Sequence, residues 1–405
     1  MQIKVSAPRK SMNWRILISL IFARLSARPH FILISILLVD IADSFQVPVG
    51  VMSQIRSLAS IVTMIFSIIM GVLSIKYKPK PLLMIGLSFF IIAAIGCSLA
   101  RTFNVMMIIY ALTGLGNAMI IPTSQAIIGE YFDVDNRAKA ISYMLMSFTL
   151  VSALVTSPIM NQLALWGGWR LALLGYALPG AIIGFLFAYY GIPKSKIEIL
   201  DTNQKQTYVT AIKEIFTDRS AIVCVICAAL GTASFTSVST YGVSSFVERF
   251  NMSSQLRGPM WSILTFTGAF GSYLSGLLVA RFGRKRVTVI SSIIMGVLTI
   301  CFMNYNNFWI AGILITLTGI AWTIWFPAAT SLTLEQNPRY RGSIMSLNQA
   351  SSSFGMALGV SVGGLVLLQF GYGYLGLILG GLGVLGSCLY YLFSIDPTQQ
   401  EQVPI

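Results

Sequence analysis

The chain consists of long apolar stretches separated by short polar loops. A helix needs about 20 residues to cross a hydrocarbon core about 30 Å thick, and stretches of that length recur along the whole sequence. They are continuously apolar and do not alternate with polar residues, which favours helices over the strands of a membrane barrel. We predict twelve transmembrane helices, at residues 31–51, 54–75, 82–100, 105–128, 140–163, 169–190, 221–243, 260–280, 287–303, 308–332, 343–368 and 374–393.

The second half of the chain repeats the first at a constant offset of 205 residues. The paired positions include Gly71 and Gly276, Lys76 and Arg281, Gly114 and Gly319, Pro122 and Pro327, and Glu130 and Glu335. In an apolar chain, two halves with matching Gly and Pro positions are typical of transporters in which two related bundles enclose a site. We therefore predict an all-α membrane protein with two pseudo-symmetric six-helix bundles, at residues 29–192 and 220–394.

Three polar segments flank the two bundles. Residues 1–28 are basic, and we expect residues 14–25 to lie along the inner membrane surface as a short amphipathic helix. A polar loop at 193–219 joins the bundles, and residues 395–405 form a tail. With the N-terminus in the cytoplasm, the inner segments carry 22 Lys and Arg residues and the outer side carries five. This asymmetry predicts that both termini and the central loop are cytoplasmic.

Composition agrees with a multi-pass protein of the cell membrane. The mean hydropathy is +0.78 and only 10% of the residues are charged, against about 25% in soluble domains. A net charge of +14 would suggest nucleic-acid binding in a soluble protein. Here the basic residues form short clusters between apolar stretches, so we exclude nucleic acid as a partner and expect the lipid bilayer instead.

The sequence offers no sign of an enzyme, a metal site or a bound cofactor. The five cysteines lie in apolar spans, where thiols usually act as small apolar side chains. His30 is the only histidine and is too isolated for a metal site. No glycine-rich phosphate loop ends in Lys-Ser or Lys-Thr, so the chain carries no ATPase of its own. Energy for any transport must come from a gradient or a partner, and we expect a monomer.

Two carboxylates are the clearest ionisable groups inside a predicted span. Asp40 and Asp43 lie about 60° apart on one helix, and with Ser44 and Gln46 they form a polar arc. If the helix starts at Phe31, Asp40 lies about 15 Å along it, near the membrane midplane. A carboxylate that is removed from water beside another carboxylate binds a proton more readily. We therefore predict a proton or cation coupling site, with a structural tie to a hydroxyl or to Arg56 as the alternative.

The loop between the predicted spans 260–280 and 287–303 carries a recognisable motif. It reads GLLVARFGRKR from Gly276 to Arg286 and resembles the cytoplasmic signature G-x-L-A-D-R-x-G-R-R of the major facilitator superfamily. Gly71 to Lys80 form a decayed copy in the first half. Further resemblances are Gly114-x-Gly116 with Pro122, Ser157-Pro158, and Trp169-Arg170.

This resemblance implies two bundles that rock about a central site, and it implies a set of gating positions: Gly71, Gly276, Arg281, Gly283, Arg284 and Pro158. The chain also departs from the family pattern. The signature Asp is replaced by Ile75 and Ala280, and the helix 4 Arg that antiporters use for proton transfer falls on Tyr110. The resemblance therefore supports transport more firmly than any one coupling mechanism.

In the resembled fold, the first helix of each three-helix unit lines the site. The candidate substrate-binding residues are Gln46, Tyr110, Thr113, Asn117, Tyr241, Trp322 and Trp325, with Asn348 and Gln349 from the eleventh span. Each has an alternative interpretation, because hydroxyls and amides also bond between membrane helices and Trp also anchors helices at the interface.

We predict a secondary active transporter for a small molecule, most similar to the drug or metabolite:proton antiporters and exporting its substrate. No Lys or Arg falls clearly in the middle of a predicted span, so we expect a neutral or cationic, partly apolar substrate. One rival is an uptake symporter or facilitator for a sugar or small organic acid. Another is a non-transporting sensor or lipid-handling protein on the same scaffold.

Overall fold

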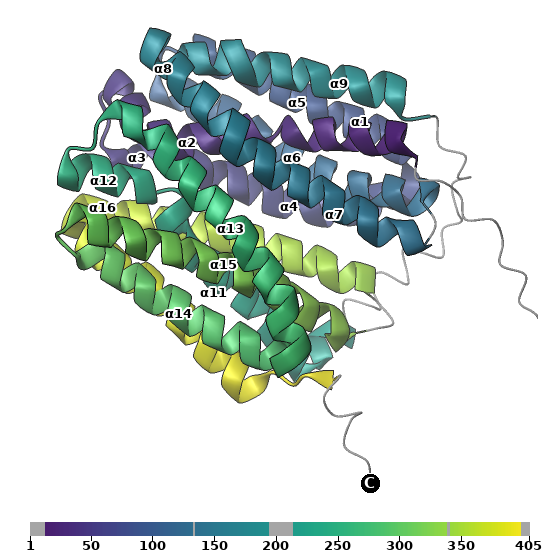
Figure 1. Ribbon diagram of the computed structural model, residues 1–405. Coiled ribbons are helices and arrows are strands. Elements are labelled where there is room, and N and C mark those ends of the chain that lie inside the picture. The colour runs from purple at the N-terminus through teal and green to yellow at the C-terminus, as the bar shows by residue number, and fades with distance from the viewer. Residues whose placement is uncertain (1–12, 133, 194–213, 338–340, 398–405) are drawn as a thin grey trace, which may run out of the picture.

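The computed structural model describes residues 13–132, 134–193, 214–337 and 341–397, and within these ranges it contains helices and no strand (Figure 1). The first half contains α1 (Trp14–Leu25), α2 (Arg28–Phe45), α3 (Val49–Met52), α4 (Gln54–Lys76), α5 (Pro79–Leu99), α6 (Phe103–Tyr131), α7 (Val134–Val151), the π-helical turn η1 (Ser152–Thr156), α8 (Ser157–Ala172), the π-helical turn η2 (Leu173–Ala177) and α9 (Leu178–Gly191). The second half contains α11 (Arg219–Ser239), α12 (Gly242–Phe250), α13 (Ser254–Phe282), α14 (Arg284–Asn304), α15 (Phe308–Gln336) and α16 (Arg341–Phe393).

The two halves of the chain form two helix bundles. Figure 1 shows the first half, from purple to teal, on one side and the second half, from green to yellow, on the other. Glycines let helices within each half approach closely: a Cβ added to Gly116 would lie 2.9 Å from the Gly86 carbonyl oxygen, and one added to Gly296 would lie 2.6 Å from that of Gly380. Small residues have this role in membrane bundles, where helices gain little from hydrophobic burial against each other.

The first span is longer than the sequence predicts. Helices α1 and α2 follow each other across a two-residue turn and together form one apolar stretch, Trp14–Phe45. Ile16, Leu17 and Leu20 are buried against α9 and its neighbours, so α1 packs inside the bundle. The prediction that residues 14–25 lie along the membrane surface is therefore wrong. Basic residues around a short apolar run suggested a surface helix, whereas here they lie on the first half of a span.

Two of the ten candidate spans are about 50 residues long, and each one folds back on itself. Gly168 and Gly371 both have a positive φ, which breaks the helix at those points. Thr156 and Tyr176 would be about 30 Å apart in a straight helix, yet their hydroxyls are 3.0 Å apart. Similarly, α11 contacts α16 at both Gly359 and Gly383. Each stretch is thus a pair of antiparallel arms.

We use "outer end" for the end of the molecule that the basic-residue asymmetry places outside the cell. The halves are in close contact at this end. Gly50 at the start of α3 packs against Gly364 of α16, and a Cβ on Gly50 would overlap the Gly364 carbonyl oxygen. Ser57 of α4 bonds to the Ala357 carbonyl at 3.1 Å and to Ser361 at 2.5 Å. The outer end is closed by direct packing of backbone on backbone.

Candidate functional site at the interface of the two halves

An ion pair joins the two halves near the outer end. Arg257, in the first turn of α13, donates to Asp40 of α2, with 2.5 Å between Nη1 and Oδ2. The Arg257 side chain is 7% exposed and the Asp40 side chain 37% exposed. Asp40 precedes the end of α2 by five residues, or about 7.5 Å, so it does not lie at the midplane. The sequence estimate failed because it measured from Phe31 and not from the true start of the span at Trp14.

The other members of the polar arc lie at the outer surface. Asp43, Ser44 and Gln46 are exposed, and Gln46 ends α2 in a left-handed conformation with φ of 54°. The Ser44 hydroxyl accepts a hydrogen bond of 3.0 Å from Trp169. Asp43 is close enough to Glu248 to influence its charge. The structure therefore separates Asp40, which binds the opposite half, from Asp43, which does not form an ion pair among the described residues.

A second set of contacts closes the interface next to this ion pair. The Tyr241 hydroxyl bonds across the interface to Ser53 at 2.9 Å, and within the second half it donates to the Val360 carbonyl at 2.6 Å. Two further bonds join α8 to α13. We refer to the contacts of Asp40, Ser53, Ser57, Ser157 and Asn161 with the second half as the outer gate. Tyr241, predicted as a substrate ligand, is completely buried and is part of this gate.

Three arginines lie within helices of the first half, where Arg56 is buried and Arg24 and Arg28 are half-buried. The sequence analysis named only Arg56, as a possible partner of Asp40. Arg28 is in the middle of the Trp14–Phe45 span, and Arg24 is one turn before it. Arg56 of α4 is 3% exposed and donates to the Ser239 carbonyl of α11 at 2.7 Å. The expectation that no cation lies in the middle of a span is therefore wrong. It failed because Arg24 and Arg28 were assigned to a cytoplasmic segment.

Aromatic rings surround these cations. The Arg28 and Arg56 guanidinium groups lie 5.0 and 3.9 Å from the centre of the Phe31 ring. Arg24 and Arg28 lie 5.4 and 4.5 Å from the ring of Phe148. Such contacts stabilise a cation without neutralising it.

The predicted substrate ligands of the fourth span form hydrogen bonds mainly within the first half. Tyr110 of α6 is buried and donates to the His30 carbonyl at 2.9 Å, and Thr113 donates to the Tyr110 carbonyl at 2.7 Å. Asn117 is half-buried. Among the described atoms neither His30 ring nitrogen has a hydrogen-bond partner, and the ring is buried against Phe90.

The aromatic candidates of the second half form a stack. Trp322 of α15 is half-buried and packs parallel to Phe235 of α11, with 4.0 Å between ring centres. Trp325 is buried and fills the space above Gly231. Asn348 is buried and Gln349 half-buried on α16. This stack lies within the second half, and the structure does not bring it into contact with Asp40.

The predicted inner gating residues differ sharply in their contacts. Arg284 begins α14, donates to Ser331 at 2.8 Å, and lies 3.8 Å from Glu335 and 4.0 Å from Asp396. Gly283 directly precedes α14 and has a φ of 83°, which allows the chain to turn between α13 and α14. Arg281 is exposed and packs over the neighbouring Phe282 ring. Gly276 is exposed with open space around it, and the surroundings of Gly71 lie outside the described side chains.

Pro158 follows the π-helical turn at the point where α8 crosses α13. The preceding Ser157 donates to the Gly258 carbonyl at 3.0 Å, and Gly258 also packs against Asn161. The wider π-helical turn and the proline together set the direction of α8 at the outer gate.

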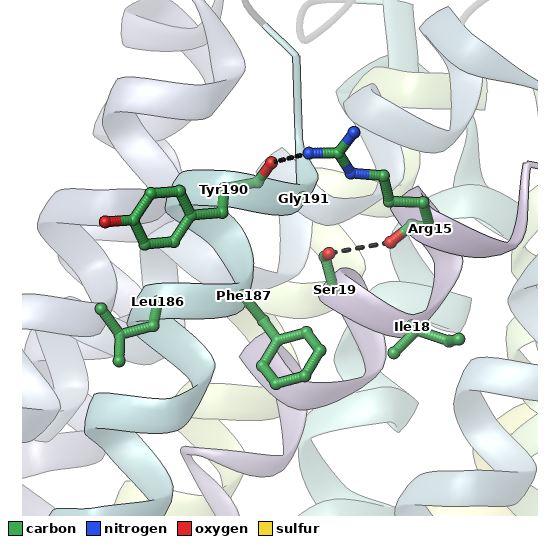
Figure 2. Close-up of a pocket in the computed structure, with 7 residues that line it drawn as sticks. All are labelled: Arg15, Ile18, Ser19, Leu186, Phe187, Tyr190 and Gly191. Carbon is green, nitrogen blue, oxygen red and sulfur yellow. Dashed lines mark hydrogen bonds between the residues drawn. The ribbon is translucent and has the colours of Figure 1, made fainter.

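One groove lies away from these residues. It has a volume of about 390 Å³, lies between α1 and α9, and is lined by Arg15, Ile18, Ser19, Leu186, Phe187, Tyr190 and Gly191 (Figure 2). Arg15 donates to the Tyr190 carbonyl at its edge. None of the candidate transport residues lines this groove.

The described residues contain ten candidate spans, and they form two repeated halves that meet at a polar interface, an arrangement typical of membrane transporters. A family comparison agrees. The model of the Major Facilitator Superfamily matches residues 18–279 and 250–404. The chain belongs to this superfamily.

Similar proteins include two MFS-type transporters of Bacillus subtilis. YwfA is 23% identical over 386 residues, which cover 88% of this chain and 87% of YwfA. YbcL is 20% identical over 395 residues, which cover 96% of this chain and 98% of YbcL. A probable sugar efflux transporter of Helicobacter pylori is 27% identical over a stretch that covers 35% of this chain and 37% of that transporter. Among solved structures, a D-xylose-proton symporter has a TM-score of 0.80 at 16% identity, covering 95% of this chain and 99% of that one. This structural likeness establishes the fold.

Proposed function

We propose that the protein is a proton-coupled secondary transporter that exports a small solute by alternating access. The observation that carries this proposal is the outer gate. The hydrogen bonds between described residues of the two halves come from the outer and middle parts of their helices, including Ser35 to the Ser239 carbonyl at 2.7 Å and Ser157 to the Gly258 carbonyl. We infer an inward-facing state, in which rocking of the halves must break these contacts to expose the site outward.

The proposed arrangement in the membrane follows from the two folded-back stretches. If each crosses the membrane twice, the ten candidate spans become the twelve that the repeat predicts. We propose that both termini lie in the cytoplasm and that the protein acts as a monomer, with its site between the halves.

Proton coupling is proposed at Asp40. Its ion pair with Arg257 is made only while the outer end is closed, because the two residues belong to opposite halves. Protonation of Asp40 removes the negative charge that holds Arg257, which lowers the free-energy cost of opening the outer gate. Asp40 is partly exposed, and we propose that it takes its proton from the outer solution. Asp43, already in solvent, is assigned a minor part.

Relatives are consistent with export without establishing it. A probable sugar efflux transporter is among them, and so is a probable 4-methylmuconolactone transporter of Cupriavidus pinatubonensis, which is 21% identical over 63% of this chain. These names support our proposal that the protein resembles metabolite:proton antiporters.

The test is transport by the purified protein in liposomes with an imposed pH gradient. We expect solute and protons to move in opposite directions, and Asp40→Asn to abolish gradient-driven accumulation while leaving solute exchange without a gradient. Movement in the same direction would replace export by symport. If no solute moves under any gradient, with the protein correctly inserted, the transporter proposal is wrong.

A further inference from the structure

We propose that the transported solute is a small organic anion whose carboxylate binds between Arg28 and Arg56. This inference rests on the proposed transport function and names its substrate class. It starts from positive charge that the protein itself does not neutralise.

Arg24, Arg28 and Arg56 form a cluster that has no carboxylate partner within the part of the chain that the structure describes. The ion pairs among the described residues join Asp40 to Arg257 and Arg284 to Glu335 and Asp396, and none of them includes the three clustered arginines. Arg28 also experiences the positive charges of both Arg24 and Arg56. A single Arg in the middle of a membrane helix costs about 2.5–3.5 kcal/mol on an insertion scale. Three that repel one another are therefore costly to keep unless an anion joins them.

The cluster keeps donors free toward the interface. Arg56 uses Nη1 for the Ser239 carbonyl, while its buried Nη2 has no hydrogen-bond partner. Arg28 uses Nε for the Ser152 hydroxyl at 2.7 Å. A guanidinium group has five N–H donors in a planar fork, so both side chains have donors left for a carboxylate, which Arg binds in a bidentate manner.

The two guanidinium groups contact the same aromatic ring. Both guanidinium carbons lie over the Phe31 ring, at 5.0 and 3.9 Å, and so within about 9 Å of each other. Phe31 also faces the second half, with its ring 6.3 Å from that of Trp261. Trp261 is buried and its indole N–H has no partner among the described residues. The site therefore combines two cations, a spare N–H donor and two aromatic faces for an apolar body.

The location links the anion to transport. Arg28 is on the first half, and Arg56 already bonds across the interface to Ser239 of the second half. An anion held between Arg28 and Arg56 competes with the Ser239 carbonyl for the donors of Arg56. Its binding therefore affects a contact across the interface that must open. An inside-negative membrane potential also favours outward movement of an anion, by about 2.3 kcal/mol per charge and 100 mV.

The test measures binding by the purified full-length protein with matched carboxylates and amides. The probes are acetate, benzoate, phenylacetate, cinnamate and succinate, each with its amide, and benzylamine as a cation. Ligand-induced increases in the thermal unfolding midpoint give the half-saturating concentrations. We expect at least one carboxylate to stabilise the protein at about tenfold or more lower concentration than its amide.

Variants locate the effect. Arg28→Gln and Arg56→Gln should each weaken carboxylate binding about tenfold or more while amide binding is unchanged, and Arg28→Lys should recover part of the loss. Arg170→Gln is the matched control, because Arg170 also lies over two aromatic rings and bonds to a backbone carbonyl, but at the outer end. If a glutamine variant does not fold, Arg28→Lys still provides the comparison of carboxylate with amide.

The outcomes separate this inference from the transport function. If amides or benzylamine bind and exchange with protons as well as carboxylates do, the protein is a transporter and the anion site is wrong. If Arg28→Gln and Arg56→Gln bind carboxylates like Arg170→Gln, the site is wrong as well. If carboxylates bind through Arg28 and Arg56 but none moves across liposome membranes, the anion site stands and the transport function falls.

Discussion

Asp40 and Arg257 lie 217 positions apart in the sequence and hold the two halves of the transporter together at its outer end. Asp40 is partly exposed and Arg257 is nearly buried. An ion pair of this kind contributes about 1 kcal/mol or less to stability. That is small for folding, yet it is enough to bias an equilibrium between two nearly balanced states by up to about fivefold.

Asp40→Asn should increase opening of the outer gate. The reporter is a cysteine at Ser361, which is covered by Ser57 of the other half in the closed state, in a variant without the native cysteines. We expect labelling by an impermeant maleimide added outside to be faster by up to about fivefold. Asp43→Asn is the matched control, because Asp43 is exposed and forms no ion pair among the described residues. Equal labelling rates in the two variants would show that the ion pair does not hold the gate.

A single added methyl group at Gly50 should prevent outer closure. The new Cβ would overlap the carbonyl oxygen of Gly364, and backbone atoms cannot move aside cheaply. We expect Gly50→Ala to keep the outer end open, with high labelling at position 361 and little transport. Gly312→Ala, where the Cβ would meet open space, is the control and should behave as wild type. Wild-type transport by Gly50→Ala would mean that the halves need not meet there.

Two arginines in the inner loop should differ in importance. Arg284 bonds to Ser331 and lies near two carboxylates, whereas Arg281 is exposed and contacts its neighbour Phe282. We expect Arg284→Gln to lower the thermal unfolding midpoint and to reduce transport several-fold, because it removes the charge that lies near Glu335 and Asp396 and the hydrogen bond to Ser331. Arg281→Gln should change both little. If the two variants lose transport equally at matched membrane expression, the greater importance of Arg284 is contradicted.

The topology can be tested by cysteine labelling in intact cells. Arg101 and Arg286 are both exposed, and the basic-residue asymmetry assigns them to opposite sides of the membrane. Arg101 lies between α5 and α6, and Arg286 lies in the first turn of α14. We expect a cysteine at position 101 to react with an impermeant reagent added outside and one at position 286 to react only after the membrane is permeabilised. Reaction of position 286 from outside would reverse the orientation.

Much of the fold could be predicted from the sequence. Eleven of the predicted spans overlap helices of the structure closely because apolar length and the repeat of glycine and proline are local signals. The first span was predicted to start at residue 31, which is 17 residues after the start of the candidate span at Trp14. Arg15, Arg24 and Arg28 interrupt the apolar pattern there. Membrane helices tolerate such residues when they face the bundle interior, which composition alone does not reveal.

The candidate site was harder to predict. Asp40 was singled out correctly as a polar residue in a span, but its partner Arg257 looks in sequence like an ordinary basic residue of an outer loop. Their pairing depends on the packing of α2 against α13 and α12. The same holds for Arg56 and Ser239, which come together only when the two halves dock. Side chains that meet across a docked interface have no spacing signal in a single sequence.

Alternating access can be measured directly as two distances in one protein. Spin labels at Leu99 and Trp309 are exposed and report the separation of the halves at the outer end, and labels at Tyr190 and Tyr391 report it at the inner end. In lipid nanodiscs we predict a short outer and a long inner distance for the wild type. Asp40→Asn should increase the population with a longer outer distance and, in equal measure, the population with a shorter inner distance. If both distances stay single and unchanged in Asp40→Asn and in Gly50→Ala, the two halves do not rock about the interface and alternating access is contradicted.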